Sequence, residues 1–171
     1  MIIKSKTYKS KSCFKPILEY LLRDYNHGEG VLYSRFVKGD QTPHDISKQL
    51  ELNDAFRLHK RSNSIKLHMS ILSFHSDDSI RLTDDRLEKI ARHWIGLRAP
   101  RAISIAIVHR DKSHVHLHVL HSGVNYRTGE SIRISKRDFQ TRKLAIEGFV
   151  RSNFPDLKRS EIDHNSSKKN A

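Results

Sequence analysis

One segment constrains the fold more than any other: residues 114–119 read His-Val-His-Leu-His-Val. Side chains of a β-strand point alternately to two faces, with a period of two residues. A strand here places His114, His116 and His118 on one face and three aliphatic side chains on the other. The pattern therefore predicts a strand that packs its aliphatic face on a core and carries a row of imidazoles on the opposite face.

The remaining patterns predict four further strands and four helices. The expected strands cover 1–9, 31–37, 65–74 and 102–109, and the histidine strand covers 114–122. Helices are expected over 16–25, over 45–59, after an N-cap at Thr83, and after an N-cap at Ser135 as far as 149. Elements in this order predict an α+β fold, in which a central antiparallel β-sheet is flanked by helices in a two- or three-layer sandwich.

Length and composition predict one folded unit. The 171 residues, of which 36% are hydrophobic, supply one core. We expect a domain over 1–155 and a polar, flexible tail over 156–171, which is rich in Lys, Ser and Asn. A single cysteine, Cys13, excludes a disulfide framework, and no run of about 18 apolar residues exists to insert into a membrane. A soluble, cytoplasmic protein is expected.

The charge predicts a polyanionic partner. The chain has 32 Lys and Arg against 19 Asp and Glu, so 32 − 19 gives a formal net charge of +13. Nucleic acid is the commonest partner of so basic a chain, because each neutralised phosphate releases a counterion. The basic residues are dispersed over several segments, which favours a folded surface that follows phosphates over one disordered arm.

The histidine strand also predicts a metal site. His109 ends the preceding strand and lies shortly before His114, so a hairpin would bring it beside His116 or His118. Three neutral imidazoles with open positions favour a transition metal over magnesium on affinity, and leave room for water or a phosphate oxygen. Asp111 is expected to orient a ligating imidazole, or else to be a turn residue.

The other histidines carry weaker predictions. His114 and His121 are expected to support the ligands or to be exposed. His68, His75 and His93 have no comparable partners along the chain, so we interpret them as structural or surface residues.

The histidine cluster resembles the metal motif of HUH endonucleases, and above all that of MOB-P-type conjugative relaxases. The residues that carry the resemblance are His109-Arg110-Asp111-x-x-His114-x-His116-x-His118. A second segment is similar to the segment with the nucleophilic tyrosine in that family, namely Phe14-x-x-x-Leu18-Glu19-Tyr20-Leu21-Leu22. The likeness covers about 1–155, and it departs from the family at His114 and Ser122, where asparagines are usual.

The resemblance implies a relaxase that nicks single-stranded origin-of-transfer DNA for conjugative mobilisation of a bacterial plasmid. Tyr20 would be the nucleophile and form a 5′-phosphotyrosine, with Asp111 as a second catalytic residue. His109, His116 and His118 would bind a divalent cation, Mn²⁺ or Mg²⁺ ahead of Zn²⁺, Ni²⁺ and Co²⁺. Relaxosome accessory proteins and a coupling protein are the further partners implied.

The helical wheel supports the choice of tyrosine independently. At about 100° per residue, Ile17, Leu18, Leu21 and Leu22 form one apolar stripe; Tyr25 falls inside it and Tyr20 near its edge. Tyr25 is thus expected in the core, and Tyr20 is expected to reach a substrate.

Three other functions fit parts of the sequence. A histidine-triad nucleotide hydrolase or transferase shares the alternating histidines of 114–120, but it leaves the charge and His109 unexplained. In rolling-circle replication initiators and small transposases the tyrosine follows the histidines, and only Tyr126 does so here. The third is a DNA-binding module with a structural metal.

Overall fold

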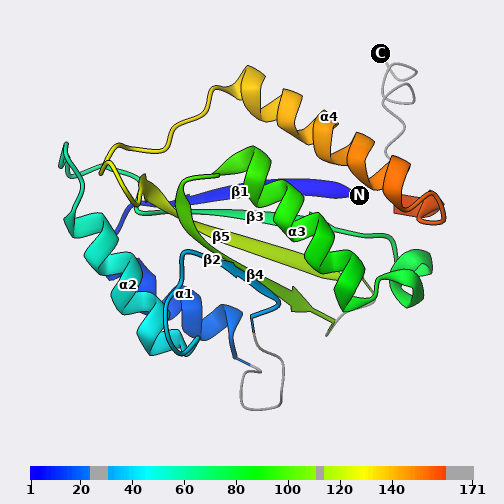
Figure 1. The fold of residues 1–171 in the computed structure, drawn as a ribbon, viewed down its shortest axis with the longest axis horizontal. Helices are drawn as coiled ribbons and strands as arrows, with labels where there is room; N and C mark the ends of the chain where they lie inside the picture. The colour runs from blue at the N-terminus through cyan, green and yellow to red at the C-terminus, as the bar shows by residue number, and fades with distance from the viewer. Residues whose placement is uncertain (24–30, 111–113, 161–171) are drawn as a thin grey trace.

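A five-stranded antiparallel sheet forms the middle of the molecule (Figure 1). The computed structural model describes residues 1–23, 31–110 and 114–160. The strands are β1 (Ile2–Tyr8), β2 (Tyr33–Arg35), β3 (Leu67–Ser73), β4 (Ala102–His109) and β5 (His116–Asn125), in the spatial order β1-β3-β5-β4-β2. The predicted class, α+β with a central antiparallel sheet, is confirmed.

Helices cover both faces, so the sandwich has three layers (Figure 1). The residues of α1 (Phe14–Leu21) and α2 (Pro43–Ala55) pack on one face, and those of α3 (Asp84–Arg98) and α4 (Lys136–Asn153) on the other. Short 3₁₀ turns complete the described chain: η1 (Lys11–Cys13), η3 (Ser76–Arg81) and η4 (Lys158–Ser160). None of the helices described is long and apolar enough to cross a membrane.

Side-chain caps begin three of the helices. Thr42, Thr83 and Ser135 each accept a hydrogen bond from the backbone N–H three residues further on, which satisfies one of the free donors of a first turn. The predicted starts at Thr83 and Ser135 are confirmed. Helix α1 begins at Phe14 and includes Pro16 in its first turn, where the missing N–H costs no intrahelical bond.

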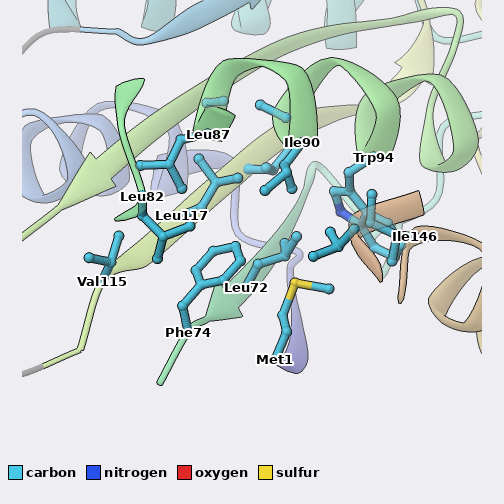
Figure 2. Packing of buried hydrophobic residues seen from close by; sticks show 14 of the residues in the cluster. Met1, Leu72, Phe74, Leu82, Leu87, Ile90, Trp94, Val115, Leu117 and Ile146 are labelled. Atoms are coloured by element: carbon cyan, nitrogen blue, oxygen red, sulfur yellow. The ribbon is translucent and has the colours of Figure 1, made fainter. Parts of the chain in front are cut away.

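The larger core lies between the sheet and the α3/α4 layer (Figure 2). Val115, Leu117 and Val119 enter it, as the alternating pattern predicts. Trp94 of α3 is fully buried there, with Ile146 of α4 close by in Figure 2.

A second core, between the sheet and the α1/α2 layer, covers the face that carries the imidazoles. Its buried members include Leu18, Leu21 and Leu50 from the helices and Met69 and Ile107 from the strands. The row of imidazoles therefore lies at the end of a packed face and under a helix, which the strand pattern alone does not reveal.

Strand register brings the ends of three strands together. His109 of β4 stands opposite His116 of β5, and Ser73 of β3 stands opposite His116 from the other side. The prediction that His109 returns beside His116 is confirmed. Asp111, in the connection between β4 and β5, lies outside the described residues.

At its other end β5 continues to Asn125, three residues past the expected limit. Gly123 makes this possible, because a Cβ there would collide with the carbonyl oxygen of Ile65, while its N–H donates to the carbonyl of Lys66. The predicted turn over 125–129 follows, with the N–H of Gly129 bonded to the carbonyl of Asn125.

The start of the polar segment 156–171 packs on the domain. Leu157 and Ser160 are buried, and the N–H of Ser160 donates to Asp78 Oδ2 at 2.7 Å. Residues 161–171 lie outside the described part of the chain, so the division at 155 stays a prediction.

Candidate active site

Tyr20 occupies the solvent side of α1. Its side chain is 54% exposed, whereas Leu18 and Leu21 on either side are buried in the second core. The ring centre of Tyr20 lies 6.2 Å from that of His109, in an edge-to-face arrangement, and the guanidinium of Arg23 lies 5.4 Å from the Tyr20 ring centre. Tyr25 lies outside the described residues.

His109 ties the end of β4 to α1. The side chain is 5% exposed, and its Nε2 lies 2.8 Å from the carbonyl oxygen of Leu21, the residue after Tyr20. A carbonyl only accepts, so Nε2 carries the proton in this bond and Nδ1 keeps its lone pair. The imidazole of His109 thus anchors the helix that carries Tyr20, and Nδ1 is the nitrogen with which it would bind a metal.

His116 and His118 extend the cluster along β5. The His118 ring lies 4.5 Å from the His109 ring, and the His116 ring lies 6.3 Å from the His118 ring. Nδ1 of His116 is 2.9 Å from Oγ of Ser73, which stands opposite it on β3. Sequence reasoning missed Ser73; its position at the end of the strand next to the histidine strand is the signal that would have found it.

The donor set fits a divalent cation, although the rings do not yet converge. In the part of the chain that the structure describes, no three His, Cys, Asp or Glu side chains stand in position to hold an ion. With metal–nitrogen bonds of about 2.1 Å, two imidazoles on one ion have ring centres about 5 Å apart. The His109–His118 pair is already at 4.5 Å, and His116 has to approach by about 1 Å.

Hydrogen bonds of the cluster support the same fit. A ligating histidine usually donates its other N–H to a carbonyl or another polar group, which fixes the ring and its tautomer. The carbonyl of Leu21 holds His109 in this way, and the hydroxyl of Ser73 contacts Nδ1 of His116.

The neighbouring histidines divide between two faces. His114 is exposed, its Nδ1 lies 3.2 Å from the carbonyl oxygen of Phe74, and its ring lies 6.2 Å from that of His75. For His121 both expectations were wrong: it is 1% exposed and lies on the other face of the sheet, stacked on His68 at 4.8 Å. Strand parity explains this, because His121 is an odd number of residues from His116 and His118.

A solved structure has a similar fold. The chain is similar to the MobM relaxase domain (MOBV; Mob_Pre) bound to 26-nucleotide pMV158 oriT DNA, with a TM-score of 0.50 and 14% identity, over 100% of this chain and 95% of that chain. A comparison with curated proteins gives no match.

Sequence comparison identifies the family. The family model for the relaxase nuclease domain of MobA/VirD2-like proteins matches residues 20–151, from the exposed tyrosine into α4. The chain therefore belongs to the MobA/VirD2-like relaxase family, a family of DNA-nicking enzymes within the HUH superfamily. The expected resemblance is confirmed, and the histidine-triad alternative loses its support.

Proposed function

We propose that this protein nicks one strand of origin-of-transfer DNA by transesterification, with Tyr20 as the nucleophile, for the mobilisation of a bacterial plasmid. The observation that carries the proposal is the position of Tyr20: it is exposed, 6.2 Å from the ring of His109, on a helix that His109 itself holds. Proximity of this kind converts attack on a bound phosphate into an intramolecular step.

The reaction exchanges one phosphodiester for another. The Tyr20 oxygen, after losing its proton to water, attacks the phosphorus of the scissile phosphate. The P–O3′ bond breaks, a 5′-phosphotyrosine forms, and the released 3′-oxygen takes up a proton. Because the bond energy is kept in the phosphotyrosine, the free 3′-OH can reverse the step without ATP.

His109, His116 and His118 are the residues that would hold a divalent cation. When bound, such an ion polarises a phosphoryl oxygen and stabilises the charge that builds up during attack. The family resemblance implies Mn²⁺ or Mg²⁺, with Zn²⁺, Ni²⁺ and Co²⁺ as alternatives, and three imidazole ligands favour Mn²⁺ over Mg²⁺ on affinity. Asp111, between β4 and β5, is proposed to orient a ligating imidazole.

The substrate is proposed to be single-stranded at the nick, as the resemblance to conjugative relaxases implies. A net charge of +13 supplies the affinity for its backbone. The similar MobM domain is bound to oriT DNA, which supports the same class of substrate. A cytoplasmic location, accessory proteins of the relaxosome and a coupling protein complete the proposal.

The test uses a labelled single-stranded oligonucleotide that spans the origin of transfer of the plasmid encoding the chain. Wild-type protein with Mn²⁺ should form a covalent adduct that survives SDS, EDTA added before the DNA should prevent its formation, and Tyr20→Phe should form none. Tyr33→Phe is the matched control, because Tyr33 lies on β2 and packs against the α3/α4 core. An adduct that persists in Tyr20→Phe and is lost in Tyr25→Phe would overturn the assignment.

A further inference from the structure

A basic cavity lies at the end of the sheet remote from the histidine cluster. Its volume is about 520 Å³, and it opens where β3 begins and β5 ends. None of the described residues around it is acidic, and five are basic: Lys9, Arg57, Arg61, Arg98 and Arg133. Gly123 forms part of its wall, where a side chain would collide with the backbone of Ile65.

Arg57 belongs to the frame of the cavity. Its Nε donates to Asp54 Oδ1 at 2.9 Å, Nη1 to Ser131 Oγ at 2.7 Å, and Nη2 to the carbonyl of Ile65 at 2.6 Å. Asp54 also pairs with Lys66 at 2.6 Å. Because Arg57 has a carboxylate partner, its charge does not call for a ligand.

Arg98, at the end of α3, differs from Arg57 because it has no carboxylate partner among the described residues. It is 3% exposed, and its Nε and Nη1 are buried with no hydrogen-bond partner. Among the described residues no Asp or Glu pairs with it, and its Nη2 lies 3.3 Å from Nδ1 of His68. Burial and the nearby Arg142 lower the pKa of Arg98 to about 10, so the guanidinium is still charged at neutral pH. The guanidinium also lies over the ring of Phe139, 5.8 Å from its centre, but a ring face neutralises no charge. A buried charge without a carboxylate partner is costly, and an anion in the cavity would offset that cost.

His68 is arranged to orient this guanidinium. Its Nε2 lies 3.2 Å from the carbonyl oxygen of Ile132, so Nε2 carries the proton and Nδ1 accepts from Arg98. The ring of His121 stacks on that of His68, with 4.8 Å between the ring centres. The neutral His68 thus holds Arg98 in place. Unlike a carboxylate, it does not neutralise the charge of Arg98, which therefore stays available for an anion in the cavity.

We propose that the cavity is a phosphate-binding site, separate from the nuclease centre, with Arg98 at its base and Arg61 and Arg133 at its exposed mouth. Arginine suits this ligand because its planar fork matches phosphate oxygens. His68 and Ser73 are five residues apart on β3, so the site lies about 17 Å from the histidine cluster at about 3.4 Å per residue. The phosphate would belong to the DNA backbone or to a free phosphate or nucleotide; the first source rests on the function proposed above.

The first experiment uses inorganic phosphate as the probe. Melting temperature is followed against phosphate concentration at constant ionic strength, so that general salt effects cancel. Loss of a charged hydrogen bond predicts an apparent affinity about ten- to a hundredfold weaker in Arg98→Met. Without phosphate, Arg98→Met should melt no lower than wild type, because a buried charge that has no carboxylate partner has been removed.

Two further variants keep the test valid if Arg98→Met does not fold. Arg133→Gln removes an exposed cation at the mouth and should weaken the phosphate response by about three- to tenfold, the loss expected for one partly solvated contact. Arg137→Gln removes a charge that is also exposed, on α4 and outside the cavity, and should respond like wild type. A phosphate response that is equal in Arg133→Gln and Arg137→Gln, or absent in wild type, overturns the proposal.

A second arm identifies the source of the phosphate. The affinity of a single-stranded oligonucleotide is measured for Arg133→Gln and Arg137→Gln. A selective loss in Arg133→Gln assigns the site to the DNA backbone, whereas equal affinities together with a weakened phosphate response assign it to a free phosphate or nucleotide. Failure of nicking leaves the phosphate titration unaffected, so the two proposals fail separately.

Discussion

The buried pair of His68 and His121 predicts a specific loss of stability in mild acid. Burial in the first place, and then the charge of Arg98, lower the pKa of His68 from 6.5 to about 4. In the unfolded chain the imidazole regains its ordinary pKa, so below pH 6.5 the unfolded state takes up a proton that the folded state refuses. Stability is therefore complete above pH 6.5 and declines as the pH falls towards 4.

The size of the effect follows from the shift. Each pKa unit corresponds to about 1.4 kcal/mol, so His68 should remove about 2 kcal/mol of folding free energy between pH 7 and pH 5. His121, whose pKa burial also lowers, acts in the same direction. Urea unfolding, followed by the fluorescence of the buried Trp94, measures the free energy at each pH.

The comparison is with His68→Gln, whose amide has a donor for the carbonyl of Ile132 and does not titrate. Between pH 7 and pH 5, wild type should lose about 2 kcal/mol more than this variant. Histidines elsewhere titrate in both proteins and cancel in the difference. Equal losses in the two proteins would refute the reasoning, because they would mean that His68 is protonated while the protein is folded.

Three other substitutions test the histidine cluster and the sheet, and one of them is a control. Ser73→Ala removes the hydroxyl 2.9 Å from His116 Nδ1 and should weaken Mn²⁺ binding about ten- to a hundredfold in calorimetric titration; an unchanged affinity would argue against His116 as a ligand. Gly123→Ala should lower the free energy of unfolding by about 1–3 kcal/mol, because its Cβ meets the carbonyl of Ile65. Gly148→Ala, with no atom within 4 Å of the added Cβ and a helical position, should keep or raise stability under the same urea assay.

The sheet was predictable wherever apolar residues alternate without interruption. Strand β4 has the bounds that the sequence predicts, since its alternating isoleucines leave little choice of register or length. The hairpin that pairs His109 with His116 followed from the same patterns and a short connection. The starts of α3 and α4 were also predictable, because Thr83 and Ser135 are residue types that favour the N-cap position.

Contacts between distant segments were beyond the sequence. The hydrogen bond from His109 to the carbonyl of Leu21 joins residues 88 positions apart, and the contact of Ser73 with His116 joins residues 43 apart. No periodicity reports such pairs, because they depend on how a helix settles on a sheet. For the same reason the sequence did not predict that Arg98 and His68 would share a cavity.

The anchoring of α1 by His109 has a consequence for genetics. The imidazole of His109 anchors the helix that carries Tyr20, the proposed nucleophile, and is also a proposed metal ligand. Replacing His109 would therefore remove both roles in one step. Loss of activity in a His109 variant would therefore not show whether the missing metal or the displaced helix is the cause. A substitution of His118 is the better test of metal dependence. His118 belongs to the neighbouring strand β5, and its ring lies 4.5 Å from the ring of His109.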